Sequence, residues 1–226
     1  MVTRLDIPQR ELQRRLATDN PWWRAGQGID AEEAAWPRRA YFTQFAQLAM
    51  ATSVRRAVVL IGPRRVGKTV ILKQLIDRLL SQGVIGLKIL YLSLDTPLYS
   101  GRTLESLVQI FIDQHGHRDG ETLWVLFDEV QYLKDWEVHL KSLVDTYAHI
   151  RFIVSGSAAA ALRMKSRESG AGRFTEFILP PLTFAEYLSF AGHEDELVYE
   201  SPSAIDRAPP IGRPTSTHSI RSSSIT

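Results

Sequence analysis

Apolar and polar residues follow two alternating patterns along the chain. Short runs rich in apolar and β-branched residues predict strands, at residues 57–61, 88–94, 123–127, 151–154 and 174–179. Apolar residues at helical spacing predict helices between these strands, over residues 69–81, 104–114 and 136–147, with a last helix from Thr183. Strands that alternate with helices form parallel sheets with right-handed crossovers. We therefore expect an α/β fold with a five-stranded parallel sheet flanked by helices.

The two ends of the chain differ from the central domain, which we place at residues 46–192. Residues 1–45 predict an N-terminal helical extension, and we expect Trp22 and Trp23 to anchor it on the core. Residues 193–226 are rich in Ser, Thr and Pro and contain few large apolar side chains. Such a segment cannot bury enough surface to order itself, so we predict a disordered tail.

A phosphate-binding motif lies between the first predicted strand and the first predicted helix of the central domain. Residues 62–69 match G-x-x-x-x-G-K-[ST]. The glycines allow backbone N–H groups to surround phosphate oxygens, and the following helix directs its positive dipole end at the same charge. We expect Lys68 to reach the β- and γ-phosphates and the Thr69 hydroxyl to bind Mg²⁺. The predicted nucleotide-binding residues are Gly62, Pro63, Arg64, Arg65, Val66, Gly67, Lys68, Thr69 and Val70.

Two carboxylates follow the third predicted strand. Asp128 fits the strand-end aspartate that holds Mg²⁺, and Glu129 fits the carboxylate that orients or deprotonates an attacking water. Acidic pairs after strands also occur as simple turn residues, but the phosphate loop upstream favours the functional reading. Because residues 88–94 form a strand that is intermediate in sequence, we expect at least one strand between the phosphate-loop strand and the Asp128 strand. This arrangement is typical of additional-strand P-loop ATPases.

Two further candidate sites lie next to predicted strands, one just after the fourth strand and one just before the fifth. Ser155 or Ser157 could contact the γ-phosphate or the attacking water, and a hydroxyl that caps the next helix is an equally good reading. Arg173 follows a glycine just before the fifth strand. It could supply a cation to the transition state, in the same chain or in a neighbouring subunit. The alternative is an ordinary surface arginine.

Composition and charge exclude several classes of function. The chain contains no cysteine, which excludes disulfides, thiolate metal sites and cysteine catalysis. It shows neither a secretory signal in its first residues nor an apolar run long enough to span a membrane, so we predict a cytoplasmic protein. The 27 basic and 25 acidic residues give a net charge of +2, which does not predict nucleic-acid binding. We read the arginine pairs as solvated surface, namely residues 14–15, 38–39, 55–56 and 64–65.

Taken together, these segments resemble the prokaryotic AAA-family P-loop ATPases, which often carry a C-terminal domain of unknown function. The resemblance covers roughly residues 20–188 and rests on residues 62–69, 128–131, 155–157, 172–173 and 179–187. It implies an AAA-like core with Lys68, Thr69, Asp128 and Glu129 in the roles given above. It also implies a sensor at Ser157 and an arginine finger at Arg173.

The chain departs from this family pattern after the last predicted helix. Family members continue into a second domain, whereas this chain continues into the Ser/Pro-rich tail. We therefore expect a truncated or frame-shifted member, which the coding DNA beyond the codon for Tyr199 would test.

The sequence favours an ATPase motor or switch that uses ATP and Mg²⁺. The alternative is a nucleotide-binding switch or interaction module with little turnover, and Glu129 distinguishes the two because hydrolysis requires it. A phosphotransferase is disfavoured, since no acceptor pocket or lid is visible in the sequence. A homo-oligomer or a protein partner is compatible with the sequence, and nothing in it requires nucleic acid or a membrane.

Overall fold

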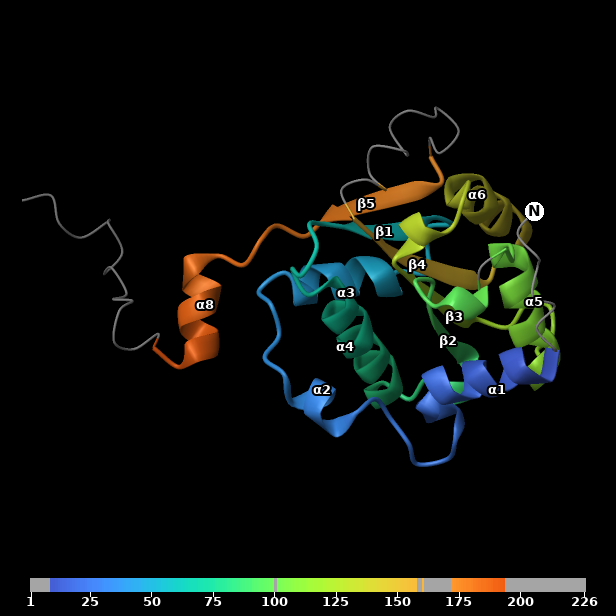
Figure 1. The fold of residues 1–226 in the computed structure, drawn as a ribbon, viewed down its shortest axis with the longest axis horizontal. Helices are drawn as coiled ribbons and strands as arrows, with labels where there is room; N and C mark the ends of the chain where they lie inside the picture. The colour runs from blue at the N-terminus through green and yellow to red at the C-terminus, as the bar shows by residue number, and fades with distance from the viewer. Residues whose placement is uncertain (1–8, 100, 158–159, 161–171, 194–226) are drawn as a thin grey trace, which may run out of the picture.

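A five-stranded, wholly parallel sheet forms the centre of the structure (Figure 1). The computed structural model describes residues 9–99, 101–157, 160 and 172–193. The spatial order of the strands is β2-β3-β4-β1-β5. Their bounds are β1 Ala57–Ile61, β2 Ile89–Ser93, β3 Leu123–Asp128, β4 Ile150–Gly156 and β5 Phe174–Ile178.

Helices cover both faces of this sheet, so the predicted fold class is confirmed. Short 3₁₀ turns lie at Pro21–Trp23, Gly86–Lys88, Pro97–Tyr99 and Val130–Tyr132. The α-helices among the described residues are α1 Gln9–Asp19, α2 Ala31–Ala35, α3 Phe42–Met50, α4 Lys68–Ser81, α5 Leu104–His115, α6 Trp136–Thr146 and α8 Phe184–Ala191. None of these helices is long and apolar enough to cross a membrane.

The core consists of two apolar clusters, one on each face of the sheet. Side chains of α3 and α4 pack on one face, and side chains of α1, α5 and α6 pack on the other. Strands β1, β3 and β4 are buried along their whole length, as their nearly continuous apolar sequences predict. Strand β5 lies at the edge of the sheet and is mostly exposed or half-buried. This sandwich of layers fixes the carboxyl ends of the strands relative to one another.

The strand between β1 and β3 is β4, whereas β2 lies at the edge of the sheet. The sequence predicted a strand between these two, and this is confirmed. The prediction was wrong in assigning residues 88–94 to that place, because they form the edge strand β2. Sequence order does not set spatial order because a crossover helix can carry the chain past a neighbouring strand. The consequence is that the carboxyl end of β4 lies directly between the phosphate loop and Asp128.

The N-terminal segment is attached to the edge strand β2. The indole N–H groups of Trp22 and Trp23 donate to the carbonyl of Ile89, at 3.0 and 2.7 Å. The anchoring role predicted for the two tryptophans is therefore confirmed. Leu12 and Leu16 of α1 are fully buried in the cluster that contains α5 and α6.

Helix α8 follows β5 after an extended segment and stands apart from the layers, on the left in Figure 1. Its first turn has the predicted capping box, in which Thr183 accepts from the backbone N–H of Glu186 and the Glu186 carboxylate accepts from the N–H of Thr183. The tail predicted to be disordered lies outside the described residues, apart from His193.

Candidate functional site

Three strand ends bring the predicted site residues to one edge of the sheet. Strand β1 leads into the phosphate loop, β3 ends at Asp128, and β4 ends at Gly156. The register pairs Ile61 of β1 with Gly156 and Phe127 of β3 with Val154, so the three carboxyl ends lie level. In open α/β sheets this edge is where ligands bind.

The phosphate loop has the backbone geometry that its glycines allow. Gly67 has φ of 90°, a left-handed conformation that other residues rarely adopt. A Cβ on Gly62 would lie 2.5 Å from the carbonyl oxygen of Leu179, so the chain leaves no room for a side chain there. Helix α4 begins at Lys68, directly after the loop. The loop therefore presents backbone N–H groups at a helix N-terminus, which is an anion site.

Lys68 folds back over this loop. Its ammonium group donates to the carbonyls of Gly62, at 3.2 Å, and Pro63, at 2.9 Å, and the side chain is 3% exposed. A buried ammonium group beside a helix N-terminus can attract an anion through charge-assisted hydrogen bonds.

Asp128 is held by hydroxyl groups from three different elements. Its Oδ2 accepts from Thr69 Oγ1 at 2.7 Å and from the Tyr91 hydroxyl at 2.9 Å, and its Oδ1 accepts from Ser155. Asp128 is 1% exposed. Burial first, and then the charge of Asp128, raise the pKa of Tyr91 far above its usual value, so this hydroxyl stays protonated and donates.

Glu129 turns away from the strand and towards Lys68. Its backbone is left-handed, with φ of 58°, and its N–H donates to the hydroxyl of Ser155 at 3.1 Å. Its Oε1 lies 4.0 Å from Lys68 Nζ, and its Oε2 accepts from the side-chain amide of Gln131. The oxygen of that amide accepts from the N–H of Ser157 at 3.0 Å. A sparsely populated backbone conformation of a non-glycine residue often marks a functional position.

The donor set at this edge fits a magnesium ion. Thr69 and Asp128 offer oxygen atoms that already lie 2.7 Å apart, and Mg²⁺ prefers oxygen ligands from one or two carboxylates completed by phosphates and water. Within the described part of the chain, no group of three His, Cys, Asp or Glu residues could hold a metal. An ion held by Thr69 and Asp128 would complete its shell with water and phosphate oxygens.

The structure brings Lys68, Thr69, Asp128 and Glu129 into one contiguous network. Of the two serines left open by the sequence, Ser155 contacts both acidic residues, whereas Ser157 joins through its backbone N–H. The other loop residues form the turn between β1 and α4, where Pro63, Arg64 and Arg65 are exposed and Gly62, Val66 and Gly67 are buried or half-buried, and the half-buried Val70 lies in the first turn of α4.

Arg173 does not join this network. It immediately precedes β5, and its carbonyl accepts from the N–H of Ala57, the first residue of β1. It therefore lies at the amino edge of the sheet, opposite the phosphate loop. Its guanidinium pairs with the Asp145 carboxylate at 2.7 and 2.9 Å, and this hydrogen bonding lowers the pKa of Asp145. A role in the same chain has no support from this geometry, and a role towards a neighbouring subunit stays a prediction.

Arg39 corrects the reading of the arginine pairs as solvated surface. It is 7% exposed and forms a two-pronged pair with the Glu186 carboxylate, at 2.7 and 2.8 Å. It also donates to the carbonyl of Val66 in the phosphate loop and to those of Pro180 and Pro181. Arg39 thus connects the N-terminal segment, the phosphate loop and α8.

Sequence reasoning assigned no role to Tyr91, Gln131 or Arg39. Tyr91 lies in an apolar strand and reads as a core residue, and Arg39 looks like any surface arginine. Gln131 stands two residues after Glu129, within the segment 128–131 that carries the resemblance, but this position alone gave it no role.

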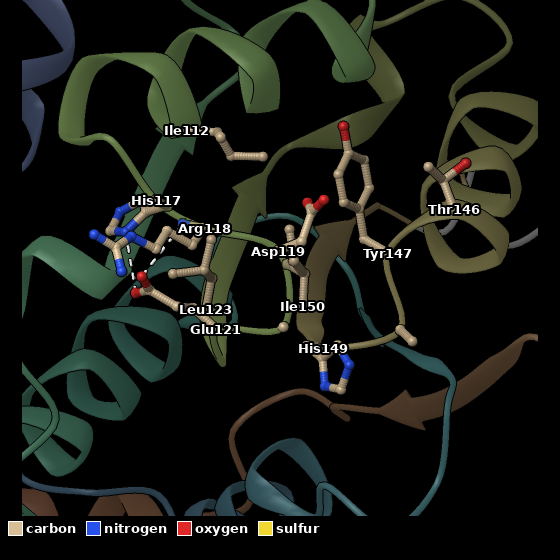
Figure 2. Close-up of a pocket in the computed structure, with 12 residues that line it drawn as sticks. Ile112, His117, Arg118, Asp119, Glu121, Leu123, Thr146, Tyr147, His149 and Ile150 are labelled. Atoms are coloured by element: carbon tan, nitrogen blue, oxygen red, sulfur yellow. Dashed lines mark hydrogen bonds and ion pairs between the residues drawn. The ribbon is translucent and has the colours of Figure 1, made fainter.

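A cavity of about 380 Å³ lies away from this network (Figure 2). Leu123 and Ile150, the first residues of β3 and β4, line it together with Ile112, His117, Tyr147 and His149. It therefore lies at the amino ends of these strands and contains none of the predicted nucleotide-binding residues.

The chain is similar to a protein-family model and to two other proteins. A family model described as AAA domain matches residues 54–188. An uncharacterized protein of Haemophilus influenzae is 30% identical over 130 residues, which cover 58% of this chain and 32% of that protein. The uncharacterized protein MJ1637 of Methanocaldococcus jannaschii is 30% identical over 135 residues, which cover 59% of this chain and 28% of that protein. The chain thus spans about a third of the length of these relatives.

Solved structures share the fold. The Aeropyrum pernix ORC2 protein, solved in ADPNP and ADP complexes, matches with a TM-score of 0.50 and 16% identity, over 78% of this chain and 55% of that one. The Saccharomyces cerevisiae Hsp104:casein complex matches with a TM-score of 0.50 and 13% identity, over 73% of this chain and 31% of that one.

Proposed function

Since this chain belongs to the AAA-domain family, whose model matches more than half of it, we propose that it binds ATP with Mg²⁺ and hydrolyses it. The observation that carries the proposal is the contact network at the carboxyl edge of β1, β4 and β3. It joins the phosphate loop, through Lys68 and Thr69, to the two carboxylates Asp128 and Glu129. A coincidental cluster of core residues would not unite a helix N-terminus, a buried ammonium group and two acids.

The residues of this edge divide the task of binding. Backbone N–H groups of residues 64–69 and the Lys68 ammonium would hold the phosphates, and Thr69 with Asp128 would hold the metal. Bound Mg²⁺ would neutralise charge on the β- and γ-phosphates. ATP is preferred to GTP by default, because the chain lacks an Asn/Thr-Lys-x-Asp guanine signature.

Glu129 is the proposed general base. A water oxygen attacks the γ-phosphorus, the bond from this phosphorus to the bridging β-oxygen breaks, and ADP leaves with that electron pair. The proton of the water passes to a carboxylate oxygen of Glu129. Ser155 and Gln131 hold the backbone and the carboxylate of Glu129, which keeps this base close to Lys68.

A nucleotide switch with little turnover is the second candidate. The bond from Gln131 to Glu129 favours it, because a carboxylate oxygen that already accepts a hydrogen bond is less available for a proton. In either case the conformational change that follows ATP binding or hydrolysis would pass to another domain, subunit or partner. This transmission is also a proposal, because the chain spans only part of the length of its relatives.

Magnesium-dependent phosphate release from ATP tests the proposal. We expect Glu129→Gln to bind ATP but to release phosphate about 100-fold more slowly than the wild type, the usual contribution of a general base. Glu176→Gln is the matched control, since this glutamate is exposed on β5. Binding without turnover in the wild type would support the switch, and absence of ATP binding would contradict both candidates.

A further inference from the structure

Tyr91 is a buried tyrosine whose hydroxyl reaches the proposed magnesium ligand. It lies in the edge strand β2, opposite Leu126 of β3, one pleat before the pair of Ser93 and Asp128. Residues two apart on a strand share a face, so Tyr91 and Asp128 lie diagonally on the same side of the sheet. The hydroxyl donates to Asp128 Oδ2 at 2.9 Å.

Contacts of its backbone and of its ring hold Tyr91 in place. Its backbone N–H and carbonyl both bond to the side chain of Asn20, at 2.6 and 2.9 Å. The ammonium group of Lys73 lies 4.2 Å from the centre of its ring, within the range of a cation–π contact. Tyr91 is 5% exposed. With its backbone and ring held in this way, Tyr91 directs its hydroxyl towards Asp128.

The three hydroxyl donors on Asp128 have different relations to the metal. Thr69 is itself a proposed ligand, so its hydroxyl oxygen would also coordinate Mg²⁺ when the ion is bound. Ser155 bonds the other carboxylate oxygen and also accepts from the backbone of Glu129. Tyr91 is thus a donor to Oδ2 that has no proposed ligand role of its own, and the Ser93 side chain on the same strand is its other hydrogen-bonding neighbour.

We propose that Tyr91 is a positioning residue that orients the Asp128 carboxylate for Mg²⁺, without touching nucleotide or metal. This inference rests on the proposed function, since it concerns the same magnesium site. Groups that hydrogen-bond a metal ligand fix its orientation, and their loss typically costs about tenfold to a hundredfold in metal affinity or activity. Removal of the Tyr91 hydroxyl should therefore weaken Mg²⁺ binding by about tenfold and leave metal-free nucleotide binding unchanged.

Tyr91→Phe tests this inference, and Tyr99→Phe is the matched control. Tyr99 is also buried, and its hydroxyl also donates to a carboxylate, Asp19 Oδ2, at 2.9 Å, but that carboxylate is not at the site. The readout is the affinity for a fluorescent, non-hydrolysable ATP analogue, measured in EDTA and then at rising Mg²⁺ concentrations. The affinity in EDTA reports on folding and on the phosphate loop. The Mg²⁺ concentration that gives half of the full change in affinity reports on the metal ligands.

We expect Tyr91→Phe to match the wild type in EDTA and to need about tenfold more Mg²⁺, while Tyr99→Phe matches the wild type in both conditions. In the background of Asp128→Asn, Tyr91→Phe should add no further change, because the two residues act through one contact. An unchanged Mg²⁺ requirement in Tyr91→Phe would overturn the inference while leaving the proposed function intact. A wild type whose nucleotide affinity ignores Mg²⁺ would overturn both.

Discussion

Lys68 illustrates how a single residue carries charge into the candidate site. Its ammonium group is almost fully buried, and its hydrogen bonds go to the loop carbonyls of Gly62 and Pro63. A buried cation whose hydrogen bonds go to neutral carbonyls remains strongly attractive to an anion. The nearest acid, Glu129 at 4.0 Å, is shared with Gln131, so it neutralises this charge incompletely.

Lys68→Ala should therefore weaken nucleotide binding. Charge-assisted hydrogen bonds contribute about 1.5 to 3 kcal/mol each, which corresponds to about tenfold to a hundredfold in affinity. Equilibrium titration with a fluorescent ATP analogue measures the loss. Lys88→Ala is the control, since Lys88 pairs with Glu121 at 3.5 Å on the surface, and we expect its affinity to equal that of the wild type. Equal affinity of Lys68→Ala and Lys88→Ala would contradict the role of Lys68.

Asn20 is a second residue whose effect can be predicted. It is fully buried, and its side chain bonds both the N–H and the carbonyl of Tyr91 as well as the carbonyl of Leu16. Asn20→Ala removes the side-chain partner of the Tyr91 N–H and carbonyl, at a cost of about 1 to 3 kcal/mol for each group that stays buried, whereas the Leu16 carbonyl keeps its bond from the backbone N–H of residue 20.

Urea unfolding should show a loss of about 3 kcal/mol in the free energy of unfolding for Asn20→Ala. Thr18→Ala removes an exposed side-chain bond to the carbonyl of Arg14 and should change this free energy little. Similar unfolding midpoints for the two variants would show that Asn20 does not hold the edge strand.

At the scale of elements, the pair of Arg39 and Glu186 ties α8 to the phosphate loop. The hydrogen bonds from Arg39, followed by those from the backbone of Thr183 and Ala40, outweigh desolvation and lower the pKa of Glu186 to about 2. An unperturbed glutamate titrates near 4.5. The pair therefore contributes its full stability above about pH 4.5 and loses it as the pH falls towards about 2.

Glu186→Gln should abolish this part of the pH dependence of stability. At about pH 6 we expect the variant to be about 3 kcal/mol less stable than the wild type, because Arg39 stays buried without its charge partner. The difference should shrink as the pH falls below about 4.5. Asp77→Asn, which removes the exposed partner of Arg38, is the control. Urea midpoints across this range that run parallel for wild type and Glu186→Gln would contradict the assignment.

The elements themselves could be predicted from the sequence because their signals are local. The apolar run at residues 57–61 coincides with β1, and the helix predicted from residue 69 begins at Lys68. Lys68, Thr69, Asp128 and Glu129 could be predicted because a motif with fixed spacing, or the end of a strand, marks each of them.

The remaining site contacts depend on long-range placement that no local pattern contains. Tyr91 lies 37 residues from Asp128, and Arg39 lies 147 residues from Glu186. The first contact follows from the register of β2 on β3, and the second from the path of the chain around the phosphate loop. Strand order is equally non-local, which is why β4 rather than β2 lies between β1 and β3.

At the scale of the whole molecule, different groups lie at the carboxyl ends and at the amino ends of the strands. The carboxyl edge carries the nucleotide network, and the amino edge carries Arg173 and the cavity shown in Figure 2. Arg173 lies far from the candidate site of its own chain, so it could act only on a nucleotide bound to a neighbouring subunit. Arg173→Ala should then keep the nucleotide affinity of the wild type and lose at least about tenfold in turnover.

Mixing two defective chains tests this arrangement. Arg173→Ala retains Glu129, and Glu129→Gln retains Arg173, so a mixture should regain phosphate release that neither variant shows alone. Arg56→Ala, another arginine of this edge, serves as the control and should turn over ATP like the wild type. A mixture no more active than its components would contradict a role of Arg173 between subunits.

The most direct test of ATP hydrolysis at this site is a single-turnover measurement. Wild-type protein in excess is incubated with labelled ATP and Mg²⁺, and the bound nucleotide is analysed over time. We expect the bound ATP to become ADP in the wild type, to persist as ATP in Glu129→Gln, and to be largely absent from Lys68→Ala. ATP that stays intact on the wild-type protein, or that is converted equally fast by Glu129→Gln, would contradict hydrolysis by this network.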